Sequence, residues 1–359
     1  MPTNTVNIYE TAVLQAAIET VGLKFSFLRD RYFPARTLYA NHSKILVDIK
    51  DGDSTLAPFV APYVGGKVVN RHGYSTFEID APYIAPKRVL GIHDLQKRAF
   101  GEPLNTERTP EQRAMDILLD DYREMDDMIA RREEKMCADV MNTNGFVAEY
   151  LADDNETVLE QAVKYYTEQA NPAEVTISTK WNANGKTVSD KLADLVDMAA
   201  ILRKNGNAAV DLLVNSVTAA KLIEDEDFRA LLDNRRMEMG EIVPQNADDN
   251  FASAFGRIAA PGVLLNIICY DGFAVENGKE KKFIADGRVI LGAPGAGHLD
   301  YGAVTQMEQS DLEWHTYSGA RVPQYLANPY GGGGKSLTIT SRPLPQPNKK
   351  NPFVVADLF

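Results

Sequence analysis

The sequence predicts an α+β protein, on three observations. Residues 41–95 carry the apolar and polar alternation of a β-hairpin arm, residues 110–141 carry the spacing of one long helix, and residues 188–299 alternate helical and strand-like segments. The arm has no core of its own, and an isolated hairpin is only marginally stable in water. We therefore expect the arm to lie on another subunit, and the chain to associate with copies of itself.

Two strands are predicted within the arm. Every second residue from Ile45 to Ile49 is apolar, and so are Phe77 and Ile79, which is the period-2 pattern of half-buried strands. Glycine-containing turns lie between them, in residues 51–73. Before the arm, a loose helical pattern predicts a segment that crosses a neighbouring subunit; it covers residues 8–28.

The long helix has clear start and stop signals. Thr109 as N-cap, Pro110 at the first helical position and Gln112 predict a capping box, and residues 142–145 supply the stop. Its predicted buried stripe consists of Met115, Leu118, Tyr122, Met125 and Ile129. The acidic pairs at 120–121 and 126–127 are expected on a solvated face of this helix.

Downstream segments predict a connecting region followed by an α/β unit. The predicted elements are a helical piece at 158–169, helices at 190–204 and 219–232, strands at 210–215 and 263–270, and a hairpin turn at 276–279. An apolar strand at 353–355 is expected to dock back on the fold.

The composition is that of a folded protein with an acidic balance. The chain has 359 residues, of which 44% are hydrophobic, enough for two or three structural units with a buried core. Its formal charge of −12 lacks the basic footprint of a nucleic-acid binder. Cys137 and Cys269 lie in apolar segments and predict neither a disulfide nor a metal pair, which fits a reducing cytoplasm. No signal peptide or membrane span is predicted.

No motif predicts a catalytic, cofactor or metal site. Lys335 and Ser336 follow four glycines, but Pro329 stands where a phosphate-binding loop requires glycine, so we interpret this segment as a flexible loop. Residues 279–282 form a small basic cluster that is expected to be solvated or to contact another subunit rather than DNA. None of the histidines has the spacing of a helical metal pair, and surface or packing roles are expected for His42, His72, His93, His298 and His315.

Four segments, in order along the chain, resemble the phage lambda-type major capsid proteins, also called the capsid protein E family. The family's extended-loop region resembles residues 62–90, PYVGGKVVNRHGYSTFEIDAPYIAPKRVL. Residues 271–292 also resemble the family, and the most specific parts of this segment are VENGKEKKF and VILG. Its N-terminal segment resembles FLRDRYFP at 27–34, and its C-terminal segment resembles SRPLPQPNKKNPFVVADLF at 341–359. Between these, residues 145–260 are similar only in general pattern.

The resemblance implies the Hong Kong 97-type phage capsid fold. The implied divisions are an N-terminal arm (1–40), an extended β loop (41–98), a peripheral domain (99–187 and 300–359) with a spine helix (110–141), and an axial domain (188–299) that faces the centre of each capsomer.

The function implied by the resemblance is that of a structural protein, not an enzyme. Copies would self-assemble into pentamers and hexamers and form the icosahedral phage head around packaged double-stranded DNA, without specific DNA binding, cofactor or membrane. Assembly in the host cytoplasm would pass through a precursor shell that expands. The implied partners are a separate scaffolding protein, a portal and, as an open alternative, a decoration protein.

We expect intersubunit contacts from the N-terminal segment, the β loop and the Lys-rich hairpin. The candidate side chains are Phe27, Arg29, Tyr63, Lys67, Arg71, Tyr74, Phe77, Lys87, Arg88, Lys281 and Lys282.

Two other classes of protein stay open at this point. A cargo compartment shell of the encapsulin type shares the implied fold, and a neighbouring gene for a cargo enzyme would favour it. An oligomeric enzyme is the weaker alternative, because it requires a convergent pocket of titrating groups and no motif predicts one.

Overall fold

The computed structural model describes most of the chain. The described residues are 11, 14–15, 26–40, 42–50, 74–96, 109–151, 157–165, 173–183, 185–225, 252–276, 278–328 and 334–359. Most of the segment predicted as a crossing helix at 8–28, and the arm tip at 51–73, lie outside these residues.

The described elements alternate helices with many short strands. The helices are α2 (Phe27–Tyr32), α3 (Ile92–Gln96), α4 (Pro110–Thr143), α5 (Val188–Lys204) and α6 (Ser216–Glu224). The strands are β1 (Ala35–Leu38), β2 (Lys44–Lys50), β3 (Tyr74–Asp80), β4 (Lys87–Gly91), β5 (Gly145–Leu151), β6 (Thr157–Lys164), β7 (Ala173–Val175), β8 (Asp211–Val214), β9 (Ala252–Ala260), β10 (Val263–Tyr270), β11 (Phe273–Glu276), β12 (Lys279–Lys282), β13 (Arg288–Gly292), β14 (Gly297–Tyr301), β15 (Val304–Met307), β16 (Trp314–Tyr317), β17 (Val322–Asn328), β18 (Gly334–Thr340), β19 (Pro343–Pro347) and β20 (Val354–Asp357).

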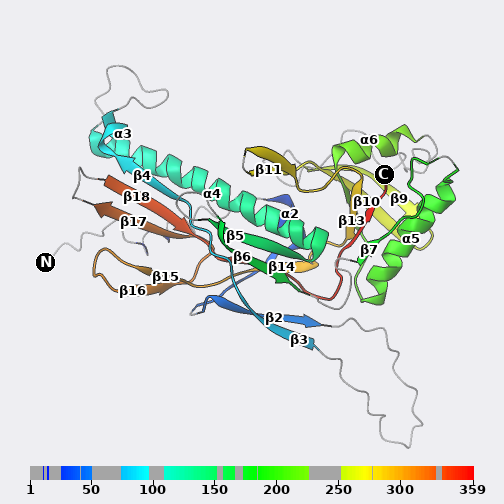
Figure 1. The fold of residues 1–359 in the computed structure, drawn as a ribbon, viewed down its shortest axis with the longest axis horizontal. Coiled ribbons are helices and arrows are strands. Elements are labelled where there is room, and N and C mark those ends of the chain that lie inside the picture. Colours follow the sequence, from blue (N-terminus) through cyan, green and yellow to red (C-terminus); the bar gives the residue numbers. More distant parts are fainter. Residues whose placement is uncertain are drawn as a thin grey trace, which may run out of the picture.

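The molecule is elongated, and its two halves have different architectures (Figure 1). In one half, α4 runs lengthwise beside the three-stranded sheet β17-β18-β4 and the β5–β6 hairpin. In the other half, α5 and α6 lie against a six-stranded sheet of order β7-β20-β13-β8-β10-β9. The β2–β3 hairpin extends along one side of the body. The observed α+β architecture confirms the predicted class.

Strands β8, β13 and β20 of the six-stranded sheet are buried on both faces, which explains their continuous apolar sequences. In β8, Leu212 packs into the cluster formed with α5 and α6, whereas the next residue, Leu213, packs into the main core with α2 and α4. The predicted strand at 353–355 is confirmed and occupies an inner position, because β20 pairs with β13 on one side and with β7 on the other.

The long helix matches its predicted signals. The Thr109 hydroxyl accepts from the Gln112 N–H, the Gln112 side chain accepts from the Thr109 N–H, and both bonds confirm the capping box. Asn144 ends the helix in the left-handed conformation, with φ of 51°. Met125 and Ile129, in the predicted stripe, are completely buried.

The root of the arm is a two-stranded ladder. β2 and β3 are antiparallel, with Ile45 opposite Ile79 and Val47 opposite Phe77. Ile45 and Val47 are completely buried, whereas Phe77 is 42% exposed. The predicted alternation is therefore confirmed for β2, whereas in β3 Ile79 is partly buried and Phe77 is exposed, so β3 is the more exposed strand.

The helical prediction at 158–169 was wrong for its described part. Residues 157–164 form β6, which pairs antiparallel with β5. Val163 and Tyr165 are buried and the intervening Lys164 is exposed, so the burial period is two rather than 3.6. The neighbouring strand, rather than the helix-compatible local sequence, decides the structure here.

The structure tests the predicted helix at 219–232 only in part. The helix predicted at 219–232 is confirmed only as far as Glu224, because residues 226–251 lie outside the described part. The boundaries between peripheral and axial domains stay a prediction, although β20 pairs with β13 of the 188–299 unit and β7 pairs with β20. Among the described residues, no helix has the length and apolar character to cross a membrane.

We predict that Gly145→Ala destabilises the folded chain. A Cβ at this position would lie 2.2 Å from the carbonyl oxygen of Val163, so β5 and β6 have to separate. We expect a loss of about 1–3 kcal/mol in the free energy of unfolding, measured by urea titration. The control is Gly334→Ala, where the nearest atom to the new Cβ is 3.9 Å away and no loss is expected. Equal urea midpoints for the two variants would contradict the prediction.

Candidate functional site

A buried carboxylate joins the N-terminal and C-terminal parts of the chain to α4. The Glu133 Oε2 atom lies 2.8 Å from Arg29 Nη1, and the Oε1 atom lies 2.6 Å from Arg321 Nη1. The hydroxyl of Tyr301 donates to Oε1 at 3.1 Å. The side chains of both arginines and of Glu133 are at most 1% exposed. We call Arg29, Glu133, Tyr301 and Arg321 the helix anchor.

The charges in the helix anchor stabilise one another. Burial by itself raises the pKa of the Glu133 carboxyl, but the charges and hydrogen bonds of Arg321 and Arg29 outweigh burial and hold that pKa below its ordinary value. Burial likewise disfavours the charged forms of both arginines, and the Glu133 charge raises their pKa values nonetheless. Arg321 also contacts Asp126 Oδ1, at 2.6 Å from Nε.

The neighbouring Glu134 caps helix α2. Its carboxylate accepts from the backbone N–H groups of Leu28 and Arg29, at 2.7 and 2.9 Å, and from the Tyr270 hydroxyl at 2.8 Å. The side chain of Ser26, the N-cap residue of α2, makes no capping bond, so Glu134 supplies the acceptor that the helix start requires. Burial raises the pKa of Glu134 above its ordinary value, although these hydrogen bonds oppose the shift.

Helix α2 also connects to the six-stranded sheet. The Arg31 Nη2 atom lies 2.7 Å from Oδ2 of the buried Asp211 in β8, and the Tyr32 hydroxyl donates to the same oxygen at 3.0 Å. Asn266 of β10 donates to Oδ1 at 3.1 Å. One short helix therefore ties α4 on one side to the sheet on the other, and the two halves share a continuous core.

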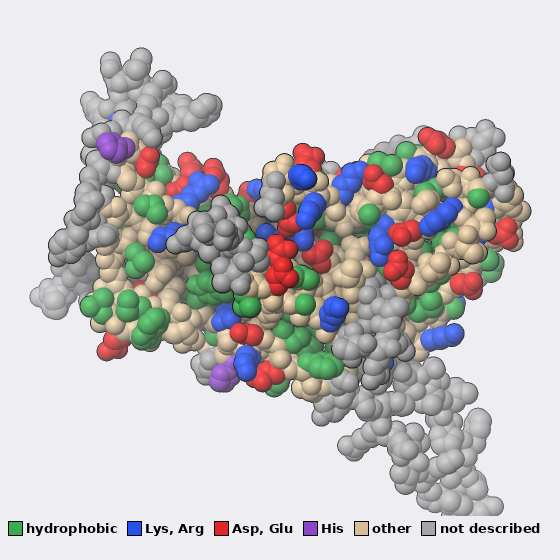
Figure 2. All heavy atoms as spheres, in the orientation of Figure 1, with side chains coloured by type: hydrophobic (Ala, Val, Ile, Leu, Met, Phe, Trp, Pro, Cys, Tyr) green, Lys and Arg blue, Asp and Glu red, His purple; other side chains and the backbone are tan. Residues whose placement is uncertain are grey.

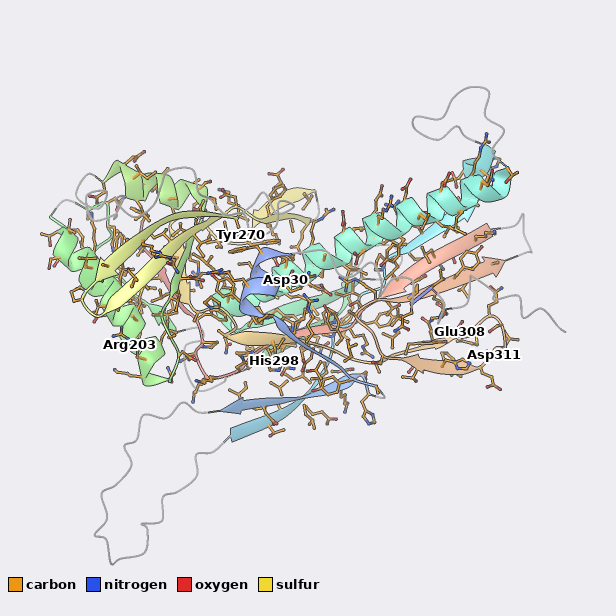
Figure 3. The ribbon with its side chains drawn as sticks, turned by 180° about the vertical axis from the view of Figure 1, so that it is seen from behind. Asp30, Arg203, Tyr270, His298, Glu308 and Asp311 are labelled. Atoms are coloured by element: carbon orange, nitrogen blue, oxygen red, sulfur yellow. The ribbon has the colours of Figure 1, made fainter. Side chains whose placement is uncertain are left out.

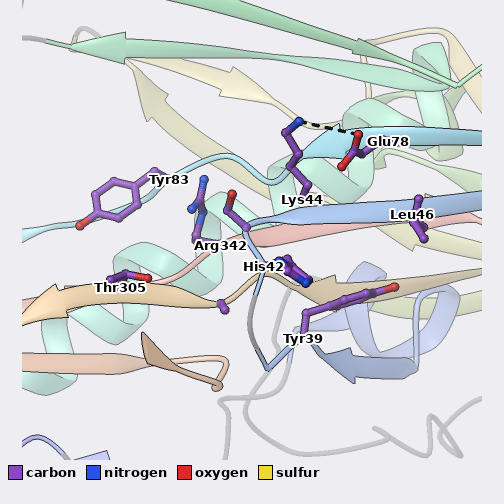
Figure 4. Close-up of a pocket in the computed structure, with 10 residues that line it drawn as sticks. Tyr39, His42, Lys44, Leu46, Glu78, Tyr83, Thr305 and Arg342 are labelled. Atoms are coloured by element: carbon purple, nitrogen blue, oxygen red, sulfur yellow. Dashed lines mark ion pairs between the residues drawn. The ribbon is translucent and has the colours of Figure 1, made fainter. Parts of the chain in front are cut away.

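The arm is fixed at its root. Arg342 donates from Nε to the Ala81 carbonyl at 3.1 Å and pairs through Nη2 with Asp80 at 3.0 Å. A hollow of about 540 Å³ lies beside this root, and Figure 4 shows the Lys44–Glu78 ion pair on its wall. The Lys44 Nζ and Glu78 Oε2 atoms are 3.7 Å apart, and both side chains are more than half exposed. The arm thus starts from a fixed base and presents open surface.

The predicted contact side chains fall into three groups. Phe77, Lys87, Lys281 and Lys282 are exposed. Phe27 and Arg88 are partly buried, whereas Arg29 is completely buried in the helix anchor. Tyr63, Lys67 and Arg71 lie outside the described residues, and only the backbone of Tyr74 is described, at the start of β3.

Several of these side chains have partners within the chain. Phe27 stacks on Tyr270, with ring centroids 5.4 Å apart. Arg88 pairs with Asp121 at 2.7 Å, and also with Glu124, both on α4. Lys281 pairs with Glu276 at 3.0 Å, and Lys282 with Asp286 at 2.7 Å. Arg29 points into the subunit, so in this conformation it binds Glu133 rather than another subunit.

Sequence reasoning missed the helix anchor, although a signal was present. Continuing the apolar spacing beyond Ile129 by four residues reaches Glu133, which places a carboxylate on the buried stripe. The expectation of a solvated face for the acidic pairs was wrong at Asp121 and Asp126, because each carboxylate binds an arginine from another segment. The sequence around Asp126 and Glu133 does not reveal that both bind Arg321, which lies 195 and 188 residues further along the chain.

One cluster of potential metal ligands occurs among the described residues. Ligand atoms of Asp311, Glu313 and His315 lie within 4.8 Å of one another. His315 Nε2 lies 2.7 Å from Asp311 Oδ2, and this ion pair accounts for the proximity. We assign no metal to it. His298 hydrogen-bonds Asn348 at 2.6 Å, so both histidines occupy surface or packing positions, as expected.

Comparison with protein families gives one match along nearly the whole chain. The family described as phage major capsid protein E matches residues 10–357. The P21 prophage-derived major head protein of Escherichia coli O6:H1 is 23% identical over 342 residues, which cover 94% of this chain and 95% of that protein. The major capsid protein of Escherichia phage lambda is 25% identical over 306 residues, covering 83% and 84%.

A solved structure shares the fold. A prophage protein of E. coli CFT073, assigned as a capsid protein, superposes with a TM-score of 0.65 and covers 97% of this chain and 99% of its own. The two sequences are 17% identical in that alignment. The likeness extends over both halves of the molecule.

We predict that Glu133→Gln strongly destabilises the subunit. The substitution keeps the side-chain size but leaves two buried guanidinium groups without their shared counter-charge. Breaking a buried pair in this way costs about 3–5 kcal/mol, measurable as a lower urea midpoint. The control is Glu78→Gln, which removes an exposed ion pair and should cost at most about 1 kcal/mol. A loss for Glu133→Gln no larger than that of the control would contradict an energetic role for the helix anchor.

The contribution of the Glu133 carboxylate to the free energy of unfolding depends on pH. Because the folded-state pKa of Glu133 is depressed, its contribution is present above the unfolded pKa of roughly 4.3 and is lost as pH falls through the lower folded value. We therefore expect the unsubstituted chain to lose more stability than Glu133→Gln between about pH 5 and pH 3. Urea titrations of both proteins across this range provide the measurement, and parallel curves would contradict the expected ionisation.

Proposed function

Because the chain belongs to the phage major capsid protein E family, we propose that it assembles into the pentamers and hexamers of an icosahedral phage head that encloses packaged double-stranded DNA. The chain is a major capsid protein with the Hong Kong 97-type fold; it forms the virion shell and is not an enzyme. The observation that carries the proposal is the family match at residues 10–357, which spans the arm, the anchored helix and the α/β unit.

We propose that assembly uses a rigid body with exposed hairpins. The helix anchor and the Asp211 contacts hold α2, α4 and the sheet in one arrangement. Head-to-tail contacts between identical subunits use two different surfaces of each copy, and such contacts close into rings. The exposed side of the β2–β3 ladder is suited to lie on the neighbouring copy as added strand surface.

The contact residues and the domain division are part of this proposal. Phe77 and Lys87 are supported as contact residues by their exposure, and the loop residues Tyr63, Lys67 and Arg71 by their place in the arm sequence. The peripheral part would contain α4, and the axial part would contain the six-stranded sheet, with the strand at 354–357 assigned to the axial part.

We also propose partners and a place of assembly. A separate scaffolding protein and a portal would act with the shell, with a decoration protein as an open alternative, and the shell would be assembled in the host cytoplasm. DNA would be enclosed without specific binding, and the net charge of −12 supports this, because each added Lys or Arg contact to phosphate would increase DNA affinity.

Negative-stain electron microscopy of the purified chain, with light scattering for mass, tests the proposal. We expect closed shells, tubes, or rings with five-fold and six-fold symmetry. A uniform small particle without this symmetry, persisting when the neighbouring phage genes are co-expressed, would contradict it.

Deleting residues 52–74 is expected to leave a soluble, folded chain that forms no shells. The deletion removes the segment that connects β2 to β3 and the first residue of β3, while the main core and the helix anchor lie elsewhere. Circular dichroism and a urea titration check folding, and light scattering checks assembly. A Gly/Ser segment of equal length serves as the second variant and should fail as well, since the arm's side chains are absent. Normal closed particles from either variant would remove the arm from the mechanism.

A single substitution tests Phe77, which lies on the same face of the ladder as the buried Val47 but is itself 42% exposed. Phe77→Ser should weaken subunit association by about 1–3 kcal/mol per contact, because burial of a Phe side chain contributes about that much. Leu46→Ser is the matched control, since Leu46 is 59% exposed and points to the opposite face of the ladder. We expect a higher protein concentration to be needed for shells of Phe77→Ser only. The same requirement in both variants would argue against a specific contact at Phe77.

A further inference from the structure

The β15–β16 hairpin ends in an exposed apolar surface. Met307, Leu312 and Trp314 are 43%, 71% and 72% exposed, and Met307 pairs with Trp314 across the hairpin. Figure 2 shows apolar side chains gathered over this end of the molecule. Large apolar side chains exposed together mark interaction sites, and Trp is enriched among the side chains that dominate binding energy.

The same hairpin end is acidic. Glu308, Asp311 and Glu313 surround the apolar side chains, and residues 303–320 contain no Lys or Arg. Figure 3 shows Glu308 and Asp311 at this end of the molecule. Hydrogen bonds from the Glu313 N–H and from His315 hold the pKa of Asp311 below its ordinary value, so this carboxylate is ionised at neutral pH. We call Met307, Glu308, Asp311, Leu312, Glu313 and Trp314 the acidic tip.

A second hairpin has the complementary composition. In β11, Phe273 and Val275 are 41% and 62% exposed, and all four residues of β12, including three lysines, are exposed. We call Phe273, Val275, Lys279, Lys281 and Lys282 the basic hairpin. Its Glu276 pairs with Arg132, Lys135 and Lys281, at 3.0, 3.6 and 3.0 Å, and Lys282 pairs with Asp286. Glu280 is also exposed, so the three lysines of residues 273–282 exceed the two glutamates by one charge.

The two hairpins lie apart in one subunit. The basic hairpin lies beside α4, near the middle of the molecule, whereas β15–β16 lies at one end and on the opposite edge (Figure 1). An acidic apolar surface and a basic apolar surface on different parts of one chain form a heterologous pair, which is the arrangement that joins identical subunits head to tail.

We propose that the acidic tip of one subunit docks on the basic hairpin of a second copy. Trp314 and Leu312 would cover Phe273 and Val275, while the carboxylates face the lysines around them. The inference rests on the proposed assembly function and names one of its contacts. The basic residues Arg203 and Lys204 at the end of α5 are a poorer partner, because the three residues that follow them, 205–207, are Asn, Gly and Asn and add no apolar side chain.

Substitution at the tip tests the apolar part of the contact. Trp314→Ser should raise the protein concentration required for shell formation about tenfold, which corresponds to about 1.4 kcal/mol. Leu264→Ser is the matched control, because Leu264 is 59% exposed but belongs to β10. We expect the control to assemble as the unsubstituted chain does. Equal effects of the two variants would overturn the proposal.

Charge reversal with rescue tests the polar part. Glu313→Lys and Lys279→Glu should each slow assembly several-fold at low salt, and the effect should decrease as salt screens the charges. The double variant should recover the original rate, since it restores opposite charges across the contact. If a single variant were slow only because it misfolds, the second substitution would not restore its assembly rate. A double variant that stays slow would therefore contradict the assigned pairing.

Cross-linking between different chains provides the direct test. One chain carries Leu312→Cys and the other Val275→Cys, both with Cys269→Ser, and Cys137 is completely buried. After co-assembly, a short bis-maleimide should give a covalent dimer in the mixture and much less with either chain alone. Normal shells without this dimer would overturn the inference and leave the proposed function intact. Absence of shells from the unsubstituted chain would instead count against the proposed function, and the inference would fall with it.

Discussion

A carboxylate shared by two buried arginines is the constraint on which the architecture depends. Glu133 receives Arg29 from the N-terminal helix and Arg321 from the segment before β17, which are 292 residues apart in sequence. A buried charge without its partner is costly, so the three segments are stable only in one mutual arrangement. The Glu134 carboxylate adds a second restraint by capping α2, and Asp211 extends the connection to the six-stranded sheet. The subunit body is thereby fixed by electrostatics as well as by apolar packing.

This fixed body contrasts with the hairpins at its surface. The largest exposed apolar side chains include Trp314 on β16, Val275 on β11 and Leu46 on β2, whereas Ile45 on the core side of β2 is completely buried. Identical copies that form a ring contact one another through two different surfaces of each copy. Hairpins on fixed roots suit such surfaces, because their contacts can be exchanged while the buried charges stay paired.

The sequence predicted those elements whose signals are local. The capping box at Thr109 and the turn at Gly278, with φ of 71°, follow from short-range chemistry. It did not predict β6, whose residues are compatible with a helix until β5 pairs with them, nor the buried role of Glu133. The resemblance of four segments along the chain supplied the family, and the partners within the chain required coordinates. The helical spacing places Glu133 on the buried stripe, but the arginines that pair with it cannot be read from the sequence around it.

The inner position of β20 has a consequence for the order of events during synthesis. This strand lies between β13 and β7, although it comes from residues 354–357. The sheet therefore stays incomplete on the ribosome until these residues have emerged, because β13 lacks one of its two neighbours. A chain that ends before residue 354 lacks an inner strand of the sheet rather than an edge strand. Such fragments lack the strand that joins β7 to the rest of the six-stranded sheet.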